Sequence, residues 1–213
     1  MPKVKICGIT NSLDYSLASD LGADYTGFIF YPGSSRFVSV EQATSIIKHL
    51  NSSSLNVGVF VNERIPLVQE AFQTAQLDIV QLHGDESPEY CRQLALPYWK
   101  AIRIDSQSAI QQIDHFRNCR ILLDSGGNAH HPYGGSGSSI PKDLLNEALE
   151  YPRQFMVAGG MSVDNLDILN GANVYGIDLC SSVESAPGRK DREKLISLFK
   201  KINQMKENRN EEL

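Results

Sequence analysis

The sequence has few cysteines, no long apolar run and no cluster of basic residues. Its 4 cysteines are far apart and form no Cys-x-x-Cys pair, so neither a disulfide framework nor a zinc ribbon is expected. Apolar pieces such as Val57-Gly58-Val59-Phe60-Val61 fall well short of the ~18 residues that cross a bilayer. The N-terminus also lacks the apolar stretch of a signal peptide. We therefore expect a cytoplasmic protein with reduced thiols.

The charge balance is mildly acidic. There are 20 Lys and Arg residues against 25 Asp and Glu, a formal net charge of −5, and no run rich in Lys or Arg. Nucleic acids and anionic lipid surfaces are bound through clustered positive charge, so neither is an expected partner. The two common nucleotide fingerprints, Gly-x-Gly-x-x-Gly after the first strand and Gly-x-x-x-x-Gly-Lys-Ser/Thr, are also missing.

Short apolar or β-branched runs alternate with longer segments of helical period, which is typical of repeated βα units around a parallel sheet. Eight units of near-equal length favour a single-domain α/β protein, a closed (β/α)₈ TIM barrel, over the alternative of an open doubly wound sheet. The predicted strands are 3–7, 25–30, 55–61, 78–82, 97–104, 119–124, 154–158 and 174–180, each followed by a predicted helix.

Capping residues mark several helix starts. Asn11, Ser39 and Ser162 each precede a segment of helical pattern and offer a side-chain oxygen to the free amides of a first turn. The chain ends in a polar segment, 206–213, that has almost nothing to bury. We therefore predict a catalytic barrel domain over 1–205 and a tail over 206–213 that frays.

In such a barrel the carboxyl ends of all strands meet at one mouth, so polar residues at those ends are candidates for catalysis. Cys7 ends the first predicted strand and Asp124 ends the sixth. A thiolate base and a protonated carboxylic acid form a possible acid/base pair, which needs a lowered pKa for the thiol and a raised pKa for the carboxyl. The alternatives are a cysteine that merely fills the core and an aspartate that caps the next helix.

Two loops rich in small residues follow the seventh and eighth predicted strands, where barrels often bind phosphate. They read Ala-Gly-Gly-Met-Ser at 158–162 and Cys-Ser-Ser-Val-Glu at 180–184. Small residues allow backbone amides to approach an anion closely, although tight turns also demand them. A third such stretch, 134–137, follows the sixth strand and is a candidate lid.

Four further polar residues are candidates for binding. Arg36, in the second loop, offers a planar fork suited to a carboxylate or phosphate, although an arbitrary loop arginine is more often only on the surface. His83 either orients a substrate or hydrogen-bonds within its own turn. His130 and His131 have no carboxylate partner nearby in sequence, so we predict no metal site.

Taken together, the motifs of the chain resemble those of the phosphoribosylanthranilate isomerase family, in the family's order and over nearly the whole length. Only the neighbourhood of the fifth βα unit contributes none. The motifs are Lys-Ile-Cys-Gly-Ile-Thr at 5–10, Gly-Ala-Asp at 22–24, Gly-Phe-Ile-Phe at 27–30, Ser-Ser-Arg-Phe-Val-Ser at 34–39, Gln-Leu-His-Gly-Asp-Glu at 81–86, Leu-Leu-Asp-Ser at 122–125, Gly-Gly-Ser-Gly at 134–137, Ala-Gly-Gly at 158–160, Val-Glu-Ser-Ala-Pro-Gly at 183–188 and Lys-Asp at 190–191.

The resemblance implies the Amadori rearrangement of N-(5-phosphoribosyl)anthranilate to the corresponding 1-deoxyribulose 5-phosphate, a step of tryptophan biosynthesis that uses no cofactor. It implies Asp124 as general acid, Cys7 as general base and a phosphorylated small molecule as the partner of a monomer or homodimer. The substrate would be held by Arg36, at its anthranilate carboxylate, and by His83, Gly135 and Gly137. The phosphate would be held by Gly159, Gly160, Ser181 and Ser182.

The chain departs from the family pattern in two places. Where the family usually reads Ser-Ser-Gly-Val-Glu, Cys180 replaces the first serine and Ser182 the glycine. A serine with positive φ would strain this turn by about 1–2 kcal/mol unless the turn adapts. The segment 138–142 also lacks the aromatic pair that follows the lid in the family.

These departures leave two alternatives. One is the related aldose–ketose isomerase of histidine biosynthesis, which usually has an aspartate where Cys7 stands. The other is a phosphate-binding barrel without catalysis. Cys7 and the single well-formed phosphate site argue against the first, and the presence of Cys7, Arg36 and Asp124 argues against the second.

Overall fold

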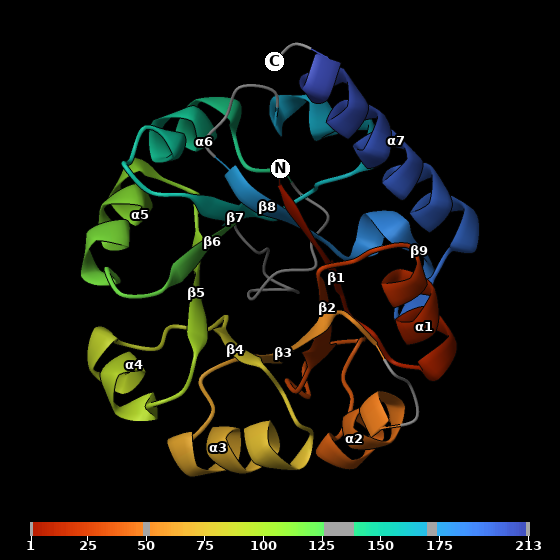
Figure 1. The fold of residues 1–213 in the computed structure, drawn as a ribbon. Coiled ribbons are helices and arrows are strands. Elements are labelled where there is room, and N and C mark those ends of the chain that lie inside the picture. Colours follow the sequence, from red (N-terminus) through yellow and green to blue (C-terminus); the bar gives the residue numbers. More distant parts are fainter. Residues whose placement is uncertain (1, 49–51, 126–138, 170–173, 212–213) are drawn as a thin grey trace.

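The computed structural model describes residues 2–48, 52–125, 139–169 and 174–211. Its parallel strands follow one another around a closed barrel in chain order, with the helices outside (Figure 1). The predicted (β/α)₈ barrel is confirmed, and the open sheet is wrong. The barrel strands are β1 Lys3–Cys7, β2 Tyr25–Ile29, β3 Leu55–Phe60, β4 Ile79–Leu82, β5 Tyr98–Arg103, β6 Arg120–Asp124, β7 Phe155–Val157 and β8 Val174–Leu179.

The first and last strands pair with each other and close the barrel. In the register of β1 with β8, Lys5 lies opposite Asp178 and Ile6 opposite Leu179. On its other side β1 pairs with β2, where Cys7 lies opposite Gly27. Closure therefore brings together residues that are more than 170 positions apart in the sequence.

The helices differ from the prediction after the last two strands. The sequence 163–169 forms a 3₁₀ helix rather than an α-helix, because its aspartates, asparagine and β-branched residues are weak helix formers. A 3₁₀ turn and a two-stranded hairpin precede the helix that follows β8. The elements are α1 Ser12–Asp20, α2 Val40–Lys48, α3 Ile65–Thr74, α4 Pro88–Leu94, α5 Gln107–Gln111, η1 Gln112–His115, α6 Lys142–Leu149, η2 Val163–Leu169, η3 Ser181–Val183, β9 Glu184–Ala186, β10 Arg189–Lys190 and α7 Arg192–Glu211.

The predicted caps lie where the helices begin. The Asn11 side chain accepts a hydrogen bond from the amide of Asp14. Ser39 and Gln42 form a reciprocal capping box, in which each side chain accepts from the other's backbone amide. Helix α7 continues past position 206 to Glu211, so secondary structure does not stop where the tail was predicted to begin. Fraying of this last part stays a prediction. Within the described residues no helix is both long and apolar enough to cross a membrane.

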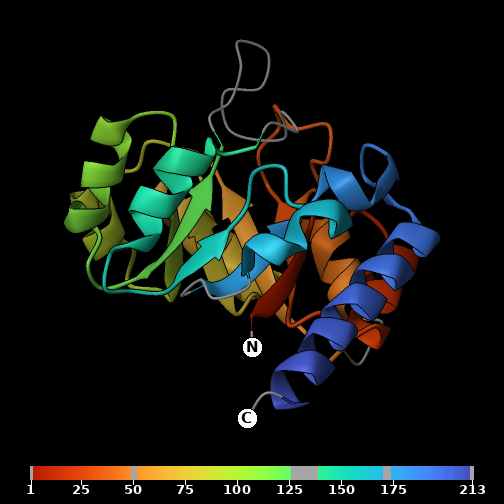
Figure 2. The ribbon, with the colours of Figure 1, turned by 90° about the horizontal axis from the view of Figure 1, so that it is seen from above.

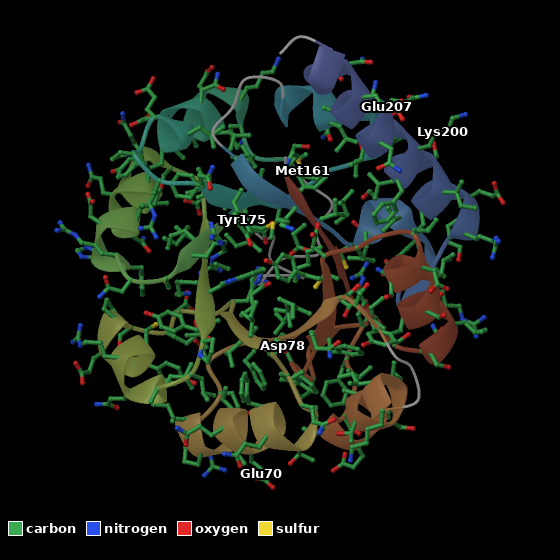
Figure 3. The ribbon with its side chains drawn as sticks, viewed as in Figure 1. Glu70, Asp78, Met161, Tyr175, Lys200 and Glu207 are labelled. Carbon is green, nitrogen blue, oxygen red and sulfur yellow. The ribbon has the colours of Figure 1, made fainter. Side chains whose placement is uncertain are left out.

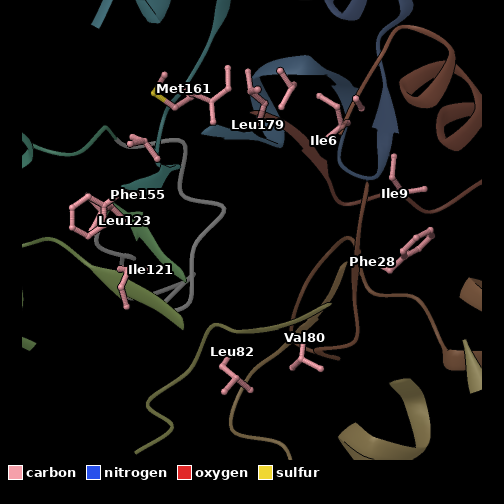
Figure 4. Close-up of a cluster of buried hydrophobic side chains, with 14 of the residues drawn as sticks. Ile6, Ile9, Phe28, Val80, Leu82, Ile121, Leu123, Phe155, Met161 and Leu179 are labelled. Atoms are coloured by element: carbon pink, nitrogen blue, oxygen red, sulfur yellow. The ribbon is translucent and has the colours of Figure 1, made fainter. Parts of the chain in front are cut away.

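Alternate residues of each strand face opposite sides of the barrel wall. One set, which includes Ile6, Leu82, Leu123 and Leu179, packs in the apolar layer between strands and helices (Figure 4). The charged residues Glu70, Lys200 and Glu207 lie on the outer side of the helix ring, whereas Tyr175 lies near the barrel axis (Figure 3).

The residues that face the barrel axis form two groups. The first, here called the inner apolar cluster, consists of Tyr25, Val57, Trp99, Ala101, Leu122, Met156 and Ala158. The second, here called the inner polar cluster, lies toward the carboxyl ends of the strands and consists of Lys5, Cys7, Gln81, His83, Asp124 and Asp178. In Figure 2 the start of β1 lies at one end of the barrel, and the segment after β2 and the β9–β10 hairpin lie at the other.

Candidate active site

Strand β1 carries a buried lysine next to the candidate base. Lys5 and Cys7 are two residues apart, so they share the inner face of the strand. Lys5 is 0% exposed and donates a hydrogen bond of 2.8 Å from Nζ to Oδ2 of Asp178. A Cβ atom on Gly27 would lie only 2.8 Å from Cys7 Sγ and 3.1 Å from Lys5 Nζ. The glycine of β2 thus leaves the space in which thiol and ammonium meet.

The surroundings of Cys7 hold its pKa well below that of a free thiol. The largest cause is a hydrogen bond with the thiol of Cys180, and the positive charges of Lys5 and Lys190 act in the same direction. Burial opposes the shift, because it disfavours the charged form, but is outweighed. The surroundings of Cys7 therefore favour its thiolate form, which is the form that a general base requires.

The ion pair beside Cys7 is fully enclosed. Burial raises the pKa of Asp178 to about 7, against the attraction of Lys5. Burial alone would lower the pKa of Lys5, but the negative charges of Asp178 and Cys7 outweigh it and raise this pKa. Oδ1 of Asp178 is buried and has no hydrogen-bond partner in the described part of the chain.

The candidate acid Asp124 lies at the end of a hydrogen-bonded chain of side chains. It is 6% exposed, and its Oδ2 is 3.0 Å from Nε2 of His83. Nδ1 of His83 is 2.8 Å from Nε2, the side-chain amide nitrogen, of Gln81. In either tautomer the imidazole ring connects the Gln81 side chain to Asp124 through its two nitrogens. The other carboxylate oxygen, Oδ1, accepts from the amide of Ser125 at 2.9 Å.

Arg36 reaches the mouth from the loop after β2 and is held there by Glu184. Nε and Nη2 of Arg36 donate to the carboxylate at distances of 2.7–3.1 Å, and the side chain is 8% exposed. Lys190 donates to the same carboxylate at 2.9 Å. The two cations outweigh the effect of burial and lower the pKa of Glu184. The guanidinium group of Arg36 is therefore fixed in direction. Its third nitrogen, Nη1, forms no hydrogen bond within the described residues.

The loop after β7 needs its glycines for their conformation. Gly159 and Gly160 have φ angles of 69° and 70°, which side chains with a Cβ rarely adopt. A Cβ on Gly159 would also lie 2.5 Å from the amide nitrogen of Ser125. The interpretation of this loop as a tight turn is therefore correct, and it does not conflict with a role in anion binding.

The loop after β8 accommodates its serine without strain. Ser182 is not among the described residues with positive φ, since residues 181–183 form the right-handed 3₁₀ turn η3. Of the two expectations for this position, adaptation of the turn is the one observed. The Ser182 hydroxyl is buried and has no partner within the described chain.

These two loops present free hydrogen-bond donors. Within the described residues, the backbone amides of Gly159, Gly160, Ser181 and Ser182 form no hydrogen bond. Unpaired amides of this kind, beside the start of a helical turn, are suited to the oxygens of a phosphate group.

The structure thus describes most of the predicted site residues at the carboxyl ends of the strands. Cys7 ends β1, Asp124 ends β6, and His83, which directly follows β4, hydrogen-bonds Asp124. The predicted substrate-binding residues Gly135 and Gly137 lie outside the described residues, as do His130 and His131. In the part of the chain that the structure describes, no three His, Cys, Asp or Glu side chains are grouped as metal ligands.

Sequence reasoning assigned no role to several residues that shape this site. Lys5 stands two residues before Cys7 on β1, and Gln81 stands two residues before His83, which directly follows β4, so the alternation of a strand was a signal for both. Glu184 and Lys190 appeared only as parts of a motif, because nothing in the sequence indicates that they meet Arg36, 148 positions away in the case of Glu184.

Comparison with known proteins agrees with the fold and identifies the family. The family model described as N-(5'phosphoribosyl)anthranilate (PRA) isomerase matches residues 4–201. The N-(5'-phosphoribosyl)anthranilate isomerase of Trichlorobacter lovleyi is 40% identical over 198 residues, which cover 92% of this chain and 95% of that protein.

Solved structures give the same result. Phosphoribosyl anthranilate isomerase from Thermotoga maritima superposes with a TM-score of 0.87 at 33% identity, covering 96% of this chain and 100% of that one. A phosphoribosyl anthranilate isomerase in complex with reduced 1-(o-carboxyphenylamino)-1-deoxyribulose 5-phosphate gives a TM-score of 0.83 at 32% identity, with the same coverage. On these grounds the chain belongs to the N-(5'-phosphoribosyl)anthranilate isomerase family.

Proposed function

We propose that this chain catalyses the Amadori rearrangement of N-(5-phosphoribosyl)anthranilate to 1-(2-carboxyphenylamino)-1-deoxyribulose 5-phosphate, in tryptophan biosynthesis. The single observation that carries the residue roles is the placement of a thiol with a lowered pKa and a carboxyl group at one barrel mouth. Strands β1 and β6, which bear them, are separated in the barrel by β7 and β8. A sugar bound between these two strands would have the Cys7 thiol on one side and the Asp124 carboxyl group on the other.

In the first step Asp124 acts as the general acid. It transfers a proton to the ribose ring oxygen while the bond between that oxygen and C1 breaks. The lone pair of the anthranilate nitrogen then forms a C1=N double bond, which gives an open-chain iminium ion. The hydrogen bond between His83 and Asp124 fixes the direction of the carboxyl group, so the acid is held in one orientation before substrate binds.

In the second step Cys7 acts as the general base. The iminium beside C2 acidifies the C2–H bond, so a thiolate is a sufficient base. As the C2 proton moves to Cys7, the electron pair of the C2–H bond forms a C1=C2 double bond. The electron pair of the C1=N double bond moves to the nitrogen, which becomes neutral. The resulting enol then converts to the keto product. Lys5 and Cys180 act on this step by stabilising the thiolate.

Substrate binding falls to groups that carry no reacting proton. Arg36, with Nη1 available and its other nitrogens held by Glu184, is suited to the anthranilate carboxylate. The amides of Gly159, Gly160, Ser181 and Ser182 and the Ser182 hydroxyl are suited to the phosphate. Binding at the two ends of the substrate orients the sugar between acid and base.

The test is turnover of freshly generated phosphoribosylanthranilate by the purified protein, followed through loss of substrate fluorescence, with Cys7→Ala as the control. We expect turnover by the wild type and its loss in the variant. A folded wild type that is inactive here but converts the two-phosphate aminoaldose of histidine biosynthesis would contradict the proposal. Inactivity on both substrates, with phosphate still bound, would indicate a binding barrel without catalysis.

We also expect the reaction to take place in the cytoplasm, without a cofactor, by a monomer or a homodimer. Light scattering coupled to size-exclusion chromatography distinguishes the two assemblies directly. Turnover by metal-free protein in the presence of a chelator checks the independence from metals.

A further inference from the structure

Cys7 has a second cysteine as its direct neighbour at the barrel mouth. In the parallel register of β1 with β8, Ile6 lies opposite Leu179, so the next pair along the two strands is Cys7 and Cys180. Adjacent strands are about 4.8 Å apart, within the range of about 4.4–6.8 Å that Cα atoms span in disulfides. The two thiols are also close enough for each to shift the pKa of the other, that of Cys7 downward and that of Cys180 upward.

Each sulfur atom lies beside a glycine at the mouth. Gly8, the residue after Cys7, adopts a φ of 75°, and a Cβ atom there would lie 3.0 Å from Cys180 Sγ. A Cβ atom on Gly27 would lie 2.8 Å from Cys7 Sγ. Gly8 thus leaves room for the thiol of Cys180, close in the chain to Cys7, and Gly27 leaves room for the thiol of Cys7. The other two cysteines, Cys91 and Cys119, lie on α4 and just before β6, away from the β1–β8 seam.

The backbone at this point favours adjustment. Cys7 is the last residue of β1, and Cys180 is the first residue after β8, where the chain turns into η3. Cys180 is partly exposed whereas Cys7 is buried, so we expect an oxidant to reach the pair from the side of Cys180. A small oxidant therefore has access to sulfur atoms whose backbones are not both held within a strand ladder.

We propose that Cys7 and Cys180 form an oxidisable dithiol, in which peroxide converts the candidate base Cys7 into a reversible disulfide with Cys180. The Cys7 thiolate attacks one oxygen of hydrogen peroxide, the O–O bond breaks, and hydroxide leaves. Cys7 then carries a sulfenic acid. The sulfur of Cys180 attacks the sulfenic sulfur, which releases hydroxide, and the thiol proton converts it to water. Two electrons pass from the two sulfurs to the peroxide.

The disulfide has two effects on the site. It removes the lone pair that takes the C2 proton, so the protein loses isomerase activity; this effect depends on the proposed function. It also protects Cys7 from further oxidation to the sulfinic acid, which ordinary thiols do not reduce. A dithiol reductant restores both sulfurs. Formation of the disulfide itself is independent of which reaction the barrel catalyses.

The experiment treats the folded wild type with hydrogen peroxide, blocks free thiols with iodoacetamide in denaturant, and analyses tryptic peptides by mass spectrometry. The 4 cysteines fall on separate tryptic peptides, 6–36, 65–92, 118–120 and 154–189. We expect peptides 6–36 and 154–189 to be joined, with a loss of about 2 Da for the two hydrogens removed. Activity, followed in parallel, should fall with peroxide and return for the most part with dithiothreitol.

Two variants provide the controls, each compared with its own untreated rate. Cys180→Ser, which introduces the serine that the family usually has here, should give no joined peptide, carry sulfinic acid on Cys7 and stay inactive after dithiothreitol. Cys119→Ser should behave as the wild type. The proposal is wrong if the wild type forms no joined peptide, or if Cys180→Ser recovers as fully as the wild type. Absence of isomerase activity would contradict the proposed function instead, while the peptide masses would still decide the disulfide.

Discussion

The inner apolar cluster and the inner polar cluster face the same barrel axis, but they come mostly from different strands, and β6 contributes to both. On β6, Leu122 belongs to the first cluster and Asp124, two residues later, to the second. The apolar cluster is held by packing, such as the edge contact of the Tyr25 and Trp99 rings at 4.8 Å. The polar cluster is held by hydrogen bonds and buried ion pairs, such as Lys5 with Asp178.

The difference shows how one barrel separates stability from chemistry. Burial of aromatic and aliphatic surface stabilises the folded chain without specific charge. Burial of charged groups is costly, and removing one partner leaves the other uncompensated. In this barrel the buried charged groups lie toward the carboxyl ends of the strands, and their burial and mutual charges shift the pKa values of Cys7 and Asp178. Substitutions in the two clusters should therefore affect different measurements.

The largest effect is expected from removing the proton carriers. Cys7→Ala and Asp124→Ala should each lower kcat by about 10²–10⁴-fold, the usual contribution of a general acid or base. Both variants should still fold to the barrel, because neither side chain belongs to the apolar clusters that hold it together. Steady-state kinetics and a melting curve on the same preparations check this. Near-normal turnover in either variant would contradict the role assigned to that residue.

The opposite pattern is expected in the inner apolar cluster. Trp99→Ala should lower the free energy of unfolding by about 3–5 kcal/mol, because it empties a large volume in a packed core. Urea unfolding at low temperature measures the loss, and turnover per folded molecule should stay close to that of the wild type. If instead kcat fell while stability did not, the division between the two clusters would be wrong.

Lys5→Met tests the electrostatics of the candidate base. The thiolate of Cys7 faces the cations Lys5 and Lys190, the carboxyl of Asp178 and the thiol of Cys180. Removing the nearest cation disfavours the thiolate, so the pKa of Cys7 rises and a higher pH is needed to ionise it. The acidic midpoint of the kcat/KM profile should move upward by about 1–3 pH units.

Asp178→Asn is the matched control for that profile, because it removes a negative charge beside the same thiolate. The acidic midpoint of its kcat/KM profile should lie at or below that of the wild type, whereas the midpoint of Lys5→Met lies above it. Equal shifts in both variants would mean that the lysine acts only through packing.

Arg36→Ala should act mainly on binding. The guanidinium carries no reacting proton, and loss of a charged hydrogen bond of about 1.5–3 kcal/mol corresponds to a KM about 10- to 100-fold higher. Arg36→Lys keeps the charge but loses the fork that Glu184 holds, so its KM should lie between those of the wild type and the alanine variant. A lost kcat with unchanged KM would contradict the binding role.

The smallest effect is expected at Ser182. Its φ is not positive, so glycine relieves no strain there, and its buried hydroxyl is free within the described chain to bind an oxygen of the phosphate. Ser182→Gly should raise KM by about 2- to 10-fold, the value of one ordinary hydrogen bond. A lower KM in this variant would show that the serine hinders the phosphate. Initial rates over a range of substrate concentrations decide between the two.

The sequence by itself determined the kind of fold and the candidates for catalysis. Apolar periodicity and capping residues such as Asn11 and Ser39 are local properties, so they predicted the βα units, and the resemblance indicated the roles of Cys7 and Asp124. It did not predict the 3₁₀ helix after β7, where local preferences for the α-helix are weak.

Only the tertiary structure decided how these residues act. Two of the contacts, Lys5 with Asp178 and Cys7 with Cys180, form when β8 pairs with β1. A third, the ion pair of Arg36 with Glu184, forms when the β9–β10 hairpin folds beside the mouth. Whether Ser182 is strained depends likewise on the turn that these contacts impose. Burial and charge separation are properties of the closed barrel, so the pKa shifts that make a thiol a base come into being only with it.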